Sequence, residues 1–235
     1  MESRTGVIGL DELRRRVARL ETRRQSGREK RLSSGCEVLD QLLPEKGFRR
    51  GTLVEWLAGD EGGGTVALSL LAAREACEKS AGPLAVLDWR GDFYPPAAIR
   101  LGISTEQLLL VRPQDVADHD WAADQLLRSV AVAAVLIWPR TSDVRTLRRW
   151  QLAAEQGGTL GLLLRPAAVR SEPSWADVRL LVEPLPGIAC EGPCLRITVL
   201  RCRGATAGQS VEVELDDETN RVRSLERRLH VASGQ

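Results

Sequence analysis

The chain has 235 residues, of which 43% are hydrophobic and 28% charged, and its formal net charge is +1. This length and composition predict one substantial globular domain with its own core. No run of about 20 apolar residues is present, which excludes a membrane-spanning helix. Residues 1–7 are polar and no apolar stretch follows them, unlike a signal peptide. We therefore expect a cytoplasmic protein.

Residues 1–31 form a basic segment, with 10 Lys and Arg against 5 Asp and Glu. Its apolar residues recur at steps of three and four, which predicts an amphipathic helix of about four turns. This apolar stripe consists of Leu10, Leu13, Val17 and Leu20. It packs either on the chain's own domain or on a partner protein, since an isolated amphipathic helix is marginal in water. The flanking arginines are either solvated or in contact with DNA. They are Arg14, Arg15 and Arg16.

From residue 32 the pattern alternates between strands and helices. Strands are expected over residues 52–57, 84–88, 107–111, 132–138 and 159–164, and helices over 37–43, 65–79, 95–101, 118–129 and 143–156. The last of these helices is expected to be capped by Thr141 or Ser142 and to end at Gly157 and Gly158. Several strands are apolar on both faces, as in a parallel sheet covered by helices. The sequence therefore predicts an α/β fold with a mostly parallel central sheet.

After residue 175 the expected strands are short and turn residues separate them. They cover residues 178–182, 195–201 and 211–215. This pattern predicts antiparallel strands that extend one edge of the sheet. We place the core domain at residues 32–222 and expect a flexible tail at residues 223–235.

A glycine-rich segment follows the first expected strand. It reads Gly59-Asp60-Glu61-Gly62-Gly63-Gly64-Thr65-Val66, whereas a working phosphate loop reads G-x-x-x-x-G-K-[ST]. Thr65 stands at the lysine position and Val66 at the position of the magnesium-binding hydroxyl, so efficient magnesium-dependent hydrolysis is not expected. The segment is either a turn that never meets nucleotide or a vestigial loop whose backbone N–H groups bind ATP or another anion weakly.

Ligands of an open parallel sheet bind beyond the carboxyl ends of its strands. Residues expected around the loop at that edge are Asp88, Arg90, Trp138 and Arg165. Trp138 follows an apolar strand where an ATPase has a magnesium-binding Asp, and it is either a core residue or a filler of the phosphate space. Arg90 or Arg165 would supply positive charge in place of the missing lysine. No residue is assigned a catalytic role.

The five cysteines do not form a recognisable metal site. They are Cys36, Cys77, Cys190, Cys194 and Cys202. The sequence gaps between the last three cysteines fit no standard zinc-binding pattern. An odd number of cysteines argues against a disulfide framework. We expect buried or idle thiols and no metal.

The order and spacing of these segments resemble the RecA superfamily over nearly all of residues 32–222. The segments that carry the resemblance are Leu32–Leu43, Gly47–Gly51, Pro83–Asp88, Tyr94–Gly102, Glu106–Pro113, Ala176–Val182 and Leu195–Arg203. This resemblance implies a RecA-like P-loop core. Arg90 falls where the recombinase has its catalytic Glu, and Trp138 falls at the end of the Walker B strand. The connections at 139–142 and 165–174 are short for the two DNA-binding loops of a recombinase, so strand exchange is not expected.

Within the superfamily, Leu147–Pro166 and the short path into Val178 are most similar to the ImuA family of SulA/RecA-like proteins. That resemblance implies an accessory role in error-prone translesion DNA synthesis during the SOS response to DNA damage. The partners that it implies are ImuB, an inactive Y-family polymerase homologue, and an error-prone replicative-type polymerase. RecA and a second copy of the chain are further candidates. The predicted function is a non-catalytic adaptor.

Two other functions stay open. One is a divergent nucleotide-binding ATPase that acts on DNA or on a DNA–protein filament. The other is DNA binding by the basic N-terminal segment together with Arg140, Arg145, Arg148 and Arg149. No platform of aromatic and basic residues for base stacking is recognisable in the sequence, so DNA binding is expected only as an accessory property.

Overall fold

The computed structural model describes residues 31–59, 64–140, 143–186, 192–216, 219 and 221–225. Several predicted features lie outside these residues. They are the helix with Leu10, Leu13, Val17 and Leu20, its arginines Arg14, Arg15 and Arg16, and the loop residues Asp60, Glu61, Gly62 and Gly63. Within the described ranges, no helix has the length and apolar character needed to span a membrane.

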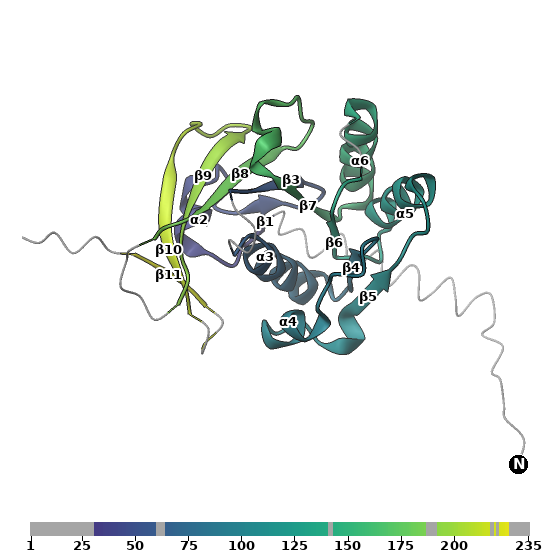
Figure 1. Cartoon of the computed structure of the whole chain (residues 1–235), viewed down its shortest axis with the longest axis horizontal. Coiled ribbons are helices and arrows are strands. Elements are labelled where there is room, and N and C mark those ends of the chain that lie inside the picture. Colours follow the sequence, from purple (N-terminus) through teal and green to yellow (C-terminus); the bar gives the residue numbers. More distant parts are fainter. Residues whose placement is uncertain are drawn as a thin grey trace, which may run out of the picture. The chain divides into compact units, whose positions relative to one another are not determined.

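A nine-stranded sheet runs through the structure in the order β11-β10-β9-β8-β3-β7-β6-β4-β5 (Figure 1). The strands from β8 to β5 are parallel. β9, β10 and β11 continue the sheet as antiparallel strands at one edge. The predicted α/β fold is therefore confirmed, including its antiparallel C-terminal edge. The strands are β3 (Leu53–Ala58), β4 (Leu84–Leu87), β5 (Leu108–Val111), β6 (Ala134–Ile137), β7 (Leu160–Pro166), β8 (Val178–Pro184), β9 (Cys194–Cys202), β10 (Ser210–Asp216) and β11 (Arg221–Ser224).

Helices connect the parallel strands, as the alternating pattern predicts. They are α3 (Thr65–Ser80), α4 (Pro95–Arg100), α5 (Val116–Arg128) and α6 (Val144–Gly157), with the 3-10 helices η1 (Thr105–Gln107) and η2 (Ala167–Ser171). A further helix, α2 (Glu37–Leu42), precedes β3. The short strands β1 (Arg31–Leu32) and β2 (Phe48–Arg49) pair in a separate antiparallel sheet.

Both faces of the sheet are packed. α3 lies on one face, and α5 and α6 lie on the other (Figure 1). Along β3, Val54 and Trp56 join the core on the α3 face, whereas Leu53 joins the core under α5 and α6. Burial on both faces explains why the central strands are continuous apolar runs.

The amino end of α6 is not capped by the residues that the sequence suggested. The N-cap is Asp143, whose Oδ2 accepts a hydrogen bond from the backbone N–H of Thr146 at 3.2 Å. Thr141 and Ser142 lie outside the described residues. A carboxylate caps as well as a hydroxyl and also complements the helix dipole. At the other end, Gly158 adopts φ 68° and terminates the helix as predicted.

The core also extends past its expected boundary at residue 222. β11 pairs with β10 through Ser224, and the backbone N–H of Leu225 donates to the carbonyl of Glu212 at 2.9 Å. Val222 packs against the core between exposed arginines. A single apolar residue is too weak a signal for a strand, so the prediction of a flexible tail is wrong for residues 223–225. Residues 226–235 lie outside the described part.

Candidate functional site

The parallel strands bring the predicted site residues to one edge of the sheet. Gly59 follows β3, Asp88 follows β4 and Trp138 follows β6. β7 and β6 lie between β3 and β4, which separates the two connections by about 14 Å at the usual strand spacing. The residues therefore share an edge but do not form one cluster.

The described glycines of the phosphate-loop segment serve close packing. The backbone N–H of Gly59 donates to the carbonyl of Val182 on β8 at 2.8 Å, and a Cβ on Gly59 would lie 3.0 Å from that oxygen. Gly64 precedes α3 with φ 71°, and a Cβ there would lie 2.5 Å from Cδ1 of Leu195. Glycine at these positions lets the end of β3 approach β8 and lets α3 approach β9 and β10, a reason that requires no nucleotide.

Thr65 and Val66 open α3 without the groups that an ATPase needs. Thr65 is 4% exposed, and its Oγ1 has no hydrogen-bond partner among the residues that the structure describes. The Val66 side chain is exposed at the place of a metal-binding hydroxyl and carries no oxygen. Neither side chain can replace the ammonium and hydroxyl groups that hold the β- and γ-phosphates and magnesium.

Asp88 stabilises the turn that follows β4. Its Oδ1 accepts hydrogen bonds from the backbone N–H groups of Gly91 and Asp92, both at 2.9 Å, and of Phe93 at 3.3 Å. Its Oδ2 lies 3.5 Å from Nε of Arg112. Arg90, in the same turn, pairs with Asp92 at 2.8 Å. The acidic group at this strand end is therefore engaged by the protein's own backbone.

Trp138 is tied to the turn after β4. The indole N–H of Trp89 donates to the carbonyl of Trp138 at 3.2 Å, and the rings of Trp138 and Phe93 are 6.4 Å apart. The guanidinium of Arg140 stacks over the ring of Trp89 at 4.6 Å. Trp138 also packs against the core on the α3 face. Aromatic packing thus takes the place where a Walker B carboxylate would end its strand.

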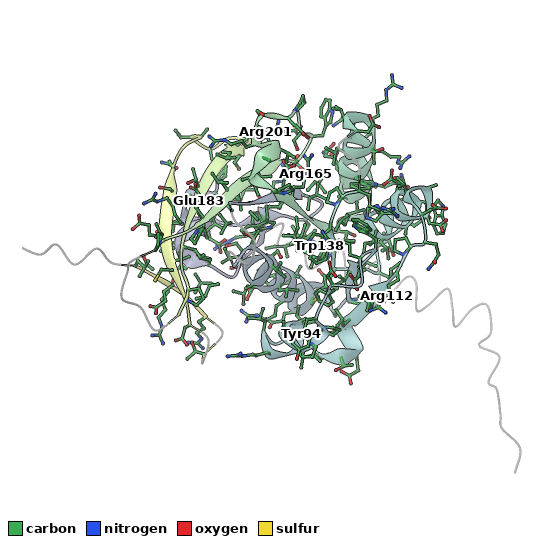
Figure 2. All side chains as sticks on the ribbon, in the orientation of Figure 1. Tyr94, Arg112, Trp138, Arg165, Glu183 and Arg201 are labelled. Atoms are coloured by element: carbon green, nitrogen blue, oxygen red, sulfur yellow. The ribbon has the colours of Figure 1, made fainter. Side chains whose placement is uncertain are left out.

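Arg165 is engaged by two carboxylates. Its Nη1 lies 2.6 Å from Oε1 of Glu55, and its Nη2 lies 2.8 Å from Oε2 of Glu172. Arg179 binds the other oxygen of Glu55, and Glu55 is fully buried in β3. Figure 2 places Arg165 toward β8 and β9, whereas Trp138 and Arg112 lie toward β4 and β5. Arg165, which we expected to supply positive charge near the loop, thus pairs with a buried carboxylate.

A second stack of Trp and Arg lies on α6 and the connection before β8. The guanidinium of Arg148 lies 4.4 Å from the ring centroid of Trp175, which is 38% exposed. Arg145 is exposed on the same helix, and Arg149 lies 3.7 Å from Asp124. The structure thus forms a basic and aromatic platform that the sequence did not reveal, because residue 175 lies in a connection far along the chain from α6.

Comparison with known proteins decides the family. The sequence profile of the RecA N-terminal domain matches residues 14–144, more than half of the chain. The chain belongs to the RecA family. RecA of Rhodopirellula baltica is 33% identical over 106 residues, which are 45% of this chain and 28% of that RecA. The RecA-like fold is shared with the RadB recombinase, whose crystal structure superimposes with a TM-score of 0.64 at 18% identity over 83% of this chain and 100% of RadB.

The similarity to ImuA extends over more of this RecA-like chain. ImuA of Caulobacter vibrioides is 26% identical over 196 residues, covering 75% of this chain and 80% of that protein. The resemblance to ImuA within the RecA superfamily is thus confirmed. Against the RecA relatives, by contrast, the chain spans less than a third of their length.

The cysteines of this RecA-like chain do not gather into a metal site in the described residues, where no group of three or more His, Cys, Asp or Glu side chains could hold an ion. Burial raises the pKa of Cys36 to about 11 and that of Cys77 to about 12, so both thiols stay protonated near neutral pH. Cys194 takes part in a disulfide, so the expectation of free thiols is wrong at that position. Cys36, Cys77 and Cys202 are free.

Proposed function

We propose that this chain is a non-catalytic RecA-like accessory protein of error-prone translesion DNA synthesis, which acts through contacts with other proteins. The observation that carries the proposal is the use of the ligand-binding edge for internal packing. Trp138 stands in the Walker B position and is packed with Trp89 and Phe93. The two arginines that could replace the missing lysine are paired with carboxylates. Several groups that one reaction requires are absent together, which supports loss of the reaction.

Nucleotide binding tests the non-catalytic part of this proposal. We expect no binding of a fluorescent ATP analogue with magnesium at millimolar concentration, and no hydrolysis, because Thr65 and Val66 stand at the positions of the lysine and the metal-binding hydroxyl. A catalytically active RecA in the same assay is the positive control. Micromolar binding with turnover would overturn the proposal in favour of the divergent ATPase.

The damage-response role rests on the similarity to ImuA. Its proposed partners are an ImuB-like inactive Y-family polymerase homologue and an error-prone replicative-type polymerase, with RecA or a second copy of the chain as further candidates. The expected docking element is the N-terminal stripe of Leu10, Leu13, Val17 and Leu20. The double substitution Leu13→Asp and Val17→Asp should abolish co-purification with the Y-family homologue and leave the fold intact. A complex that survives these substitutions would exclude this docking element.

A second function, contact with single-stranded DNA, is favoured by the stack of Arg148 on Trp175. Stacking side chains combined with arginines suit unpaired bases and their phosphates. Arg145 and Arg149 lie on the same helix and extend the positive charge. We propose this contact as an accessory property of the adaptor, consistent with the similarity to RecA proteins.

A further inference from the structure

The loops that follow β4, β5 and β6 present an aromatic and basic surface that the proposed functions leave unassigned. We call it the Trp89 surface. It comprises Trp89, Arg90, Tyr94, Arg112 and Arg140. Trp89 is 36% exposed and Tyr94 is 68% exposed. In Figure 2, Tyr94 and Arg112 lie toward α4 and β5, away from Arg165 and Arg201.

The Trp89 surface is held in place before any partner binds. The carboxylate of Asp88 closes the turn through three backbone N–H groups. The indole N–H of Trp89 joins that turn to the connection after β6 by its bond to Trp138. Arg140 stacks on the Trp89 ring at 4.6 Å, and Arg90 lies 5.7 Å from it. A stacked guanidinium keeps its N–H donors directed outward in a fixed plane, so the cost of ordering these side chains on binding is low.

The charges of the Trp89 surface fit a protein better than a nucleic acid. Arg90 pairs with Asp92, and Arg112 pairs with Asp88. Arg140 is the arginine of this surface for which no ion pair with a described carboxylate is found. One excess positive charge matches a single carboxylate, whereas a phosphate backbone requires several unpaired cations. Trp, Tyr and Arg are the residue types that dominate the binding energy of protein interfaces.

We propose that the Trp89 surface is the docking site for a protein partner that presents a carboxylate beside an apolar side chain. Arg140 binds the carboxylate, and Trp89 and Tyr94 cover the apolar group. This inference rests on the proposed adaptor function and names a second contact surface for it. The edge of the sheet at which related folds bind small ligands is used here for a protein.

The test measures the affinity of the full chain for the purified inactive Y-family polymerase homologue by isothermal titration calorimetry. Trp89→Ala and Arg140→Glu should each weaken binding by at least about 30-fold, as expected for residues at the centre of an interface. Matched controls are Trp121→Ala, which removes a Trp that is 66% exposed on α5, and Arg203→Glu, which changes an exposed arginine that follows β9. Both controls should change the affinity by less than about threefold. Circular dichroism checks that each variant is folded. If Trp89→Ala does not fold, the affinity of Arg140→Glu alone tests the proposal.

Each outcome separates the surface from the adaptor function. If the wild-type chain does not bind the polymerase homologue, both proposals are overturned. If it binds and both Trp89 and Arg140 variants bind equally well, the docking surface is wrong and the adaptor function stands. A single-stranded oligothymidylate serves as the competing probe. If Trp89→Ala and Arg140→Glu weaken oligonucleotide binding and spare protein binding, this surface contacts nucleic acid and the proposal is overturned.

Discussion

Glu55 is fully buried in the middle of β3, with arginines on both neighbouring strands. Arg165 reaches it from β7, and Arg179 reaches it from β8. Arg179 also donates to the carbonyl oxygens of Val169, Arg170 and Glu172 at 3.1–3.3 Å. The buried carboxylate therefore binds two guanidinium groups, and that of Arg179 also holds the connection between β7 and β8. A buried charge of this kind is stable only while its partners are in place.

Glu55→Gln should lower the free energy of unfolding by about 3–5 kcal/mol, because it removes the buried negative charge that the two guanidinium groups share. Urea unfolding followed by circular dichroism measures the change. Glu212→Gln is the matched control, since its ion pair with Arg196 is partly solvated, and it should cost at most about 1 kcal/mol. Equal losses for the two variants would show that Glu55 does not have this role.

His119 is a second buried titratable residue and makes stability depend on pH. Its Nδ1 lies 3.2 Å from Oδ1 of Asp120, and its ring packs on Trp150 with centroids 5.9 Å apart. Burial lowers the pKa of His119 below its ordinary value of 6.5; Asp120 acts in the opposite direction, and Arg140 adds to the lowering. The unfolded chain then binds a proton at a higher pH than the folded chain does.

The free energy of unfolding should therefore be constant above about pH 6.5, as far as His119 contributes, and decrease as the pH falls below that value. Urea unfolding at pH values on both sides of 6.5 measures this dependence. His119→Phe keeps an aromatic ring against Trp150 and removes the titrating group. The variant should lose less stability on acidification than the wild type. Parallel pH profiles for the two proteins would contradict the prediction.

At the scale of elements, α3 is placed by the glycine that precedes it. Gly64 has a positive φ, and Leu195 and Leu215 of the antiparallel edge lie against its Cα. α3 is otherwise buried along most of its length, including Leu68, Leu71 and Ala72. The close approach of α3 to β9 and β10 therefore depends on the absence of a side chain at residue 64. Packing against β9 and β10 is therefore sufficient to explain why this position of the phosphate-loop pattern is glycine.

Gly64→Ala should destabilise the fold by about 2–4 kcal/mol, the sum of a strained backbone and an overpacked contact. Gly158→Ala is the matched control. Gly158 caps the end of α6 at a similar positive φ, 68°, but a Cβ there would meet nothing within 4 Å. It should cost about 1 kcal/mol from the backbone alone. Thermal unfolding measures the loss of stability in both variants. Indistinguishable losses would mean that packing against β9 does not require Gly64.

The connection from β7 to β8 is the other element whose position depends on distant residues. Arg201 on β9 donates to the carbonyl oxygens of Ser174 and Ala176 at 2.8 and 2.6 Å, and Arg179 holds the η2 turn. These bonds place Trp175 beside α6, where Arg148 stacks on it. Hydrogen bonds from two arginines of the sheet thus hold the connection, and the exposed ring of Trp175 has a defined orientation.

At the scale of the whole molecule, two surfaces differ in how their arginines are paired. The Trp89 surface has its arginines largely paired. On α6, Arg145 interacts electrostatically with Asp143, whereas no ion pair with a described carboxylate is found for Arg148. Arg148 donates to the amide oxygen of Gln151 at 2.6 Å, which leaves its charge uncompensated. We therefore assign protein docking to the first surface and contact with single-stranded DNA to the second.

The double substitution Arg145→Ala and Arg148→Ala should weaken binding to single-stranded DNA and reduce its salt dependence by about 0.7 in the logarithmic slope for each phosphate that is no longer neutralised. Fluorescence anisotropy of a labelled oligonucleotide over a range of salt concentrations measures both quantities. Trp175→Ala should remove about 1–3 kcal/mol of stacking energy. The control is Arg203→Ala, an exposed arginine near Asp177 on another part of the surface. Unchanged affinity and slope for the double variant would exclude α6 as the DNA-binding element.

Much of the fold could be predicted, because the local pattern and the final burial agree. The apolar runs at residues 132–138 and 159–164 became β6 and β7, which are buried on both faces. β11 was missed, since Val222 alone marks its buried side. The candidate site was predicted less well. The missing lysine and hydroxyl are visible in the residues themselves, but nothing near Arg165 or Trp175 in the chain indicates what either side chain contacts.

The sequence by itself determined the alternation of strands and helices, the membership in the RecA family and the absence of the ATPase groups at Thr65, Val66 and Trp138, because each of these is a property of neighbouring residues or of their order. Only the tertiary structure decided which arginines are engaged. Arg165 and Arg179 contact Glu55, which lies 110 and 124 residues away along the chain. Arg140, which follows β6, stacks on Trp89, which follows the neighbouring strand β4. A guanidinium has the same charge in every context, and its role depends on the carboxylate or ring that folding brings beside it.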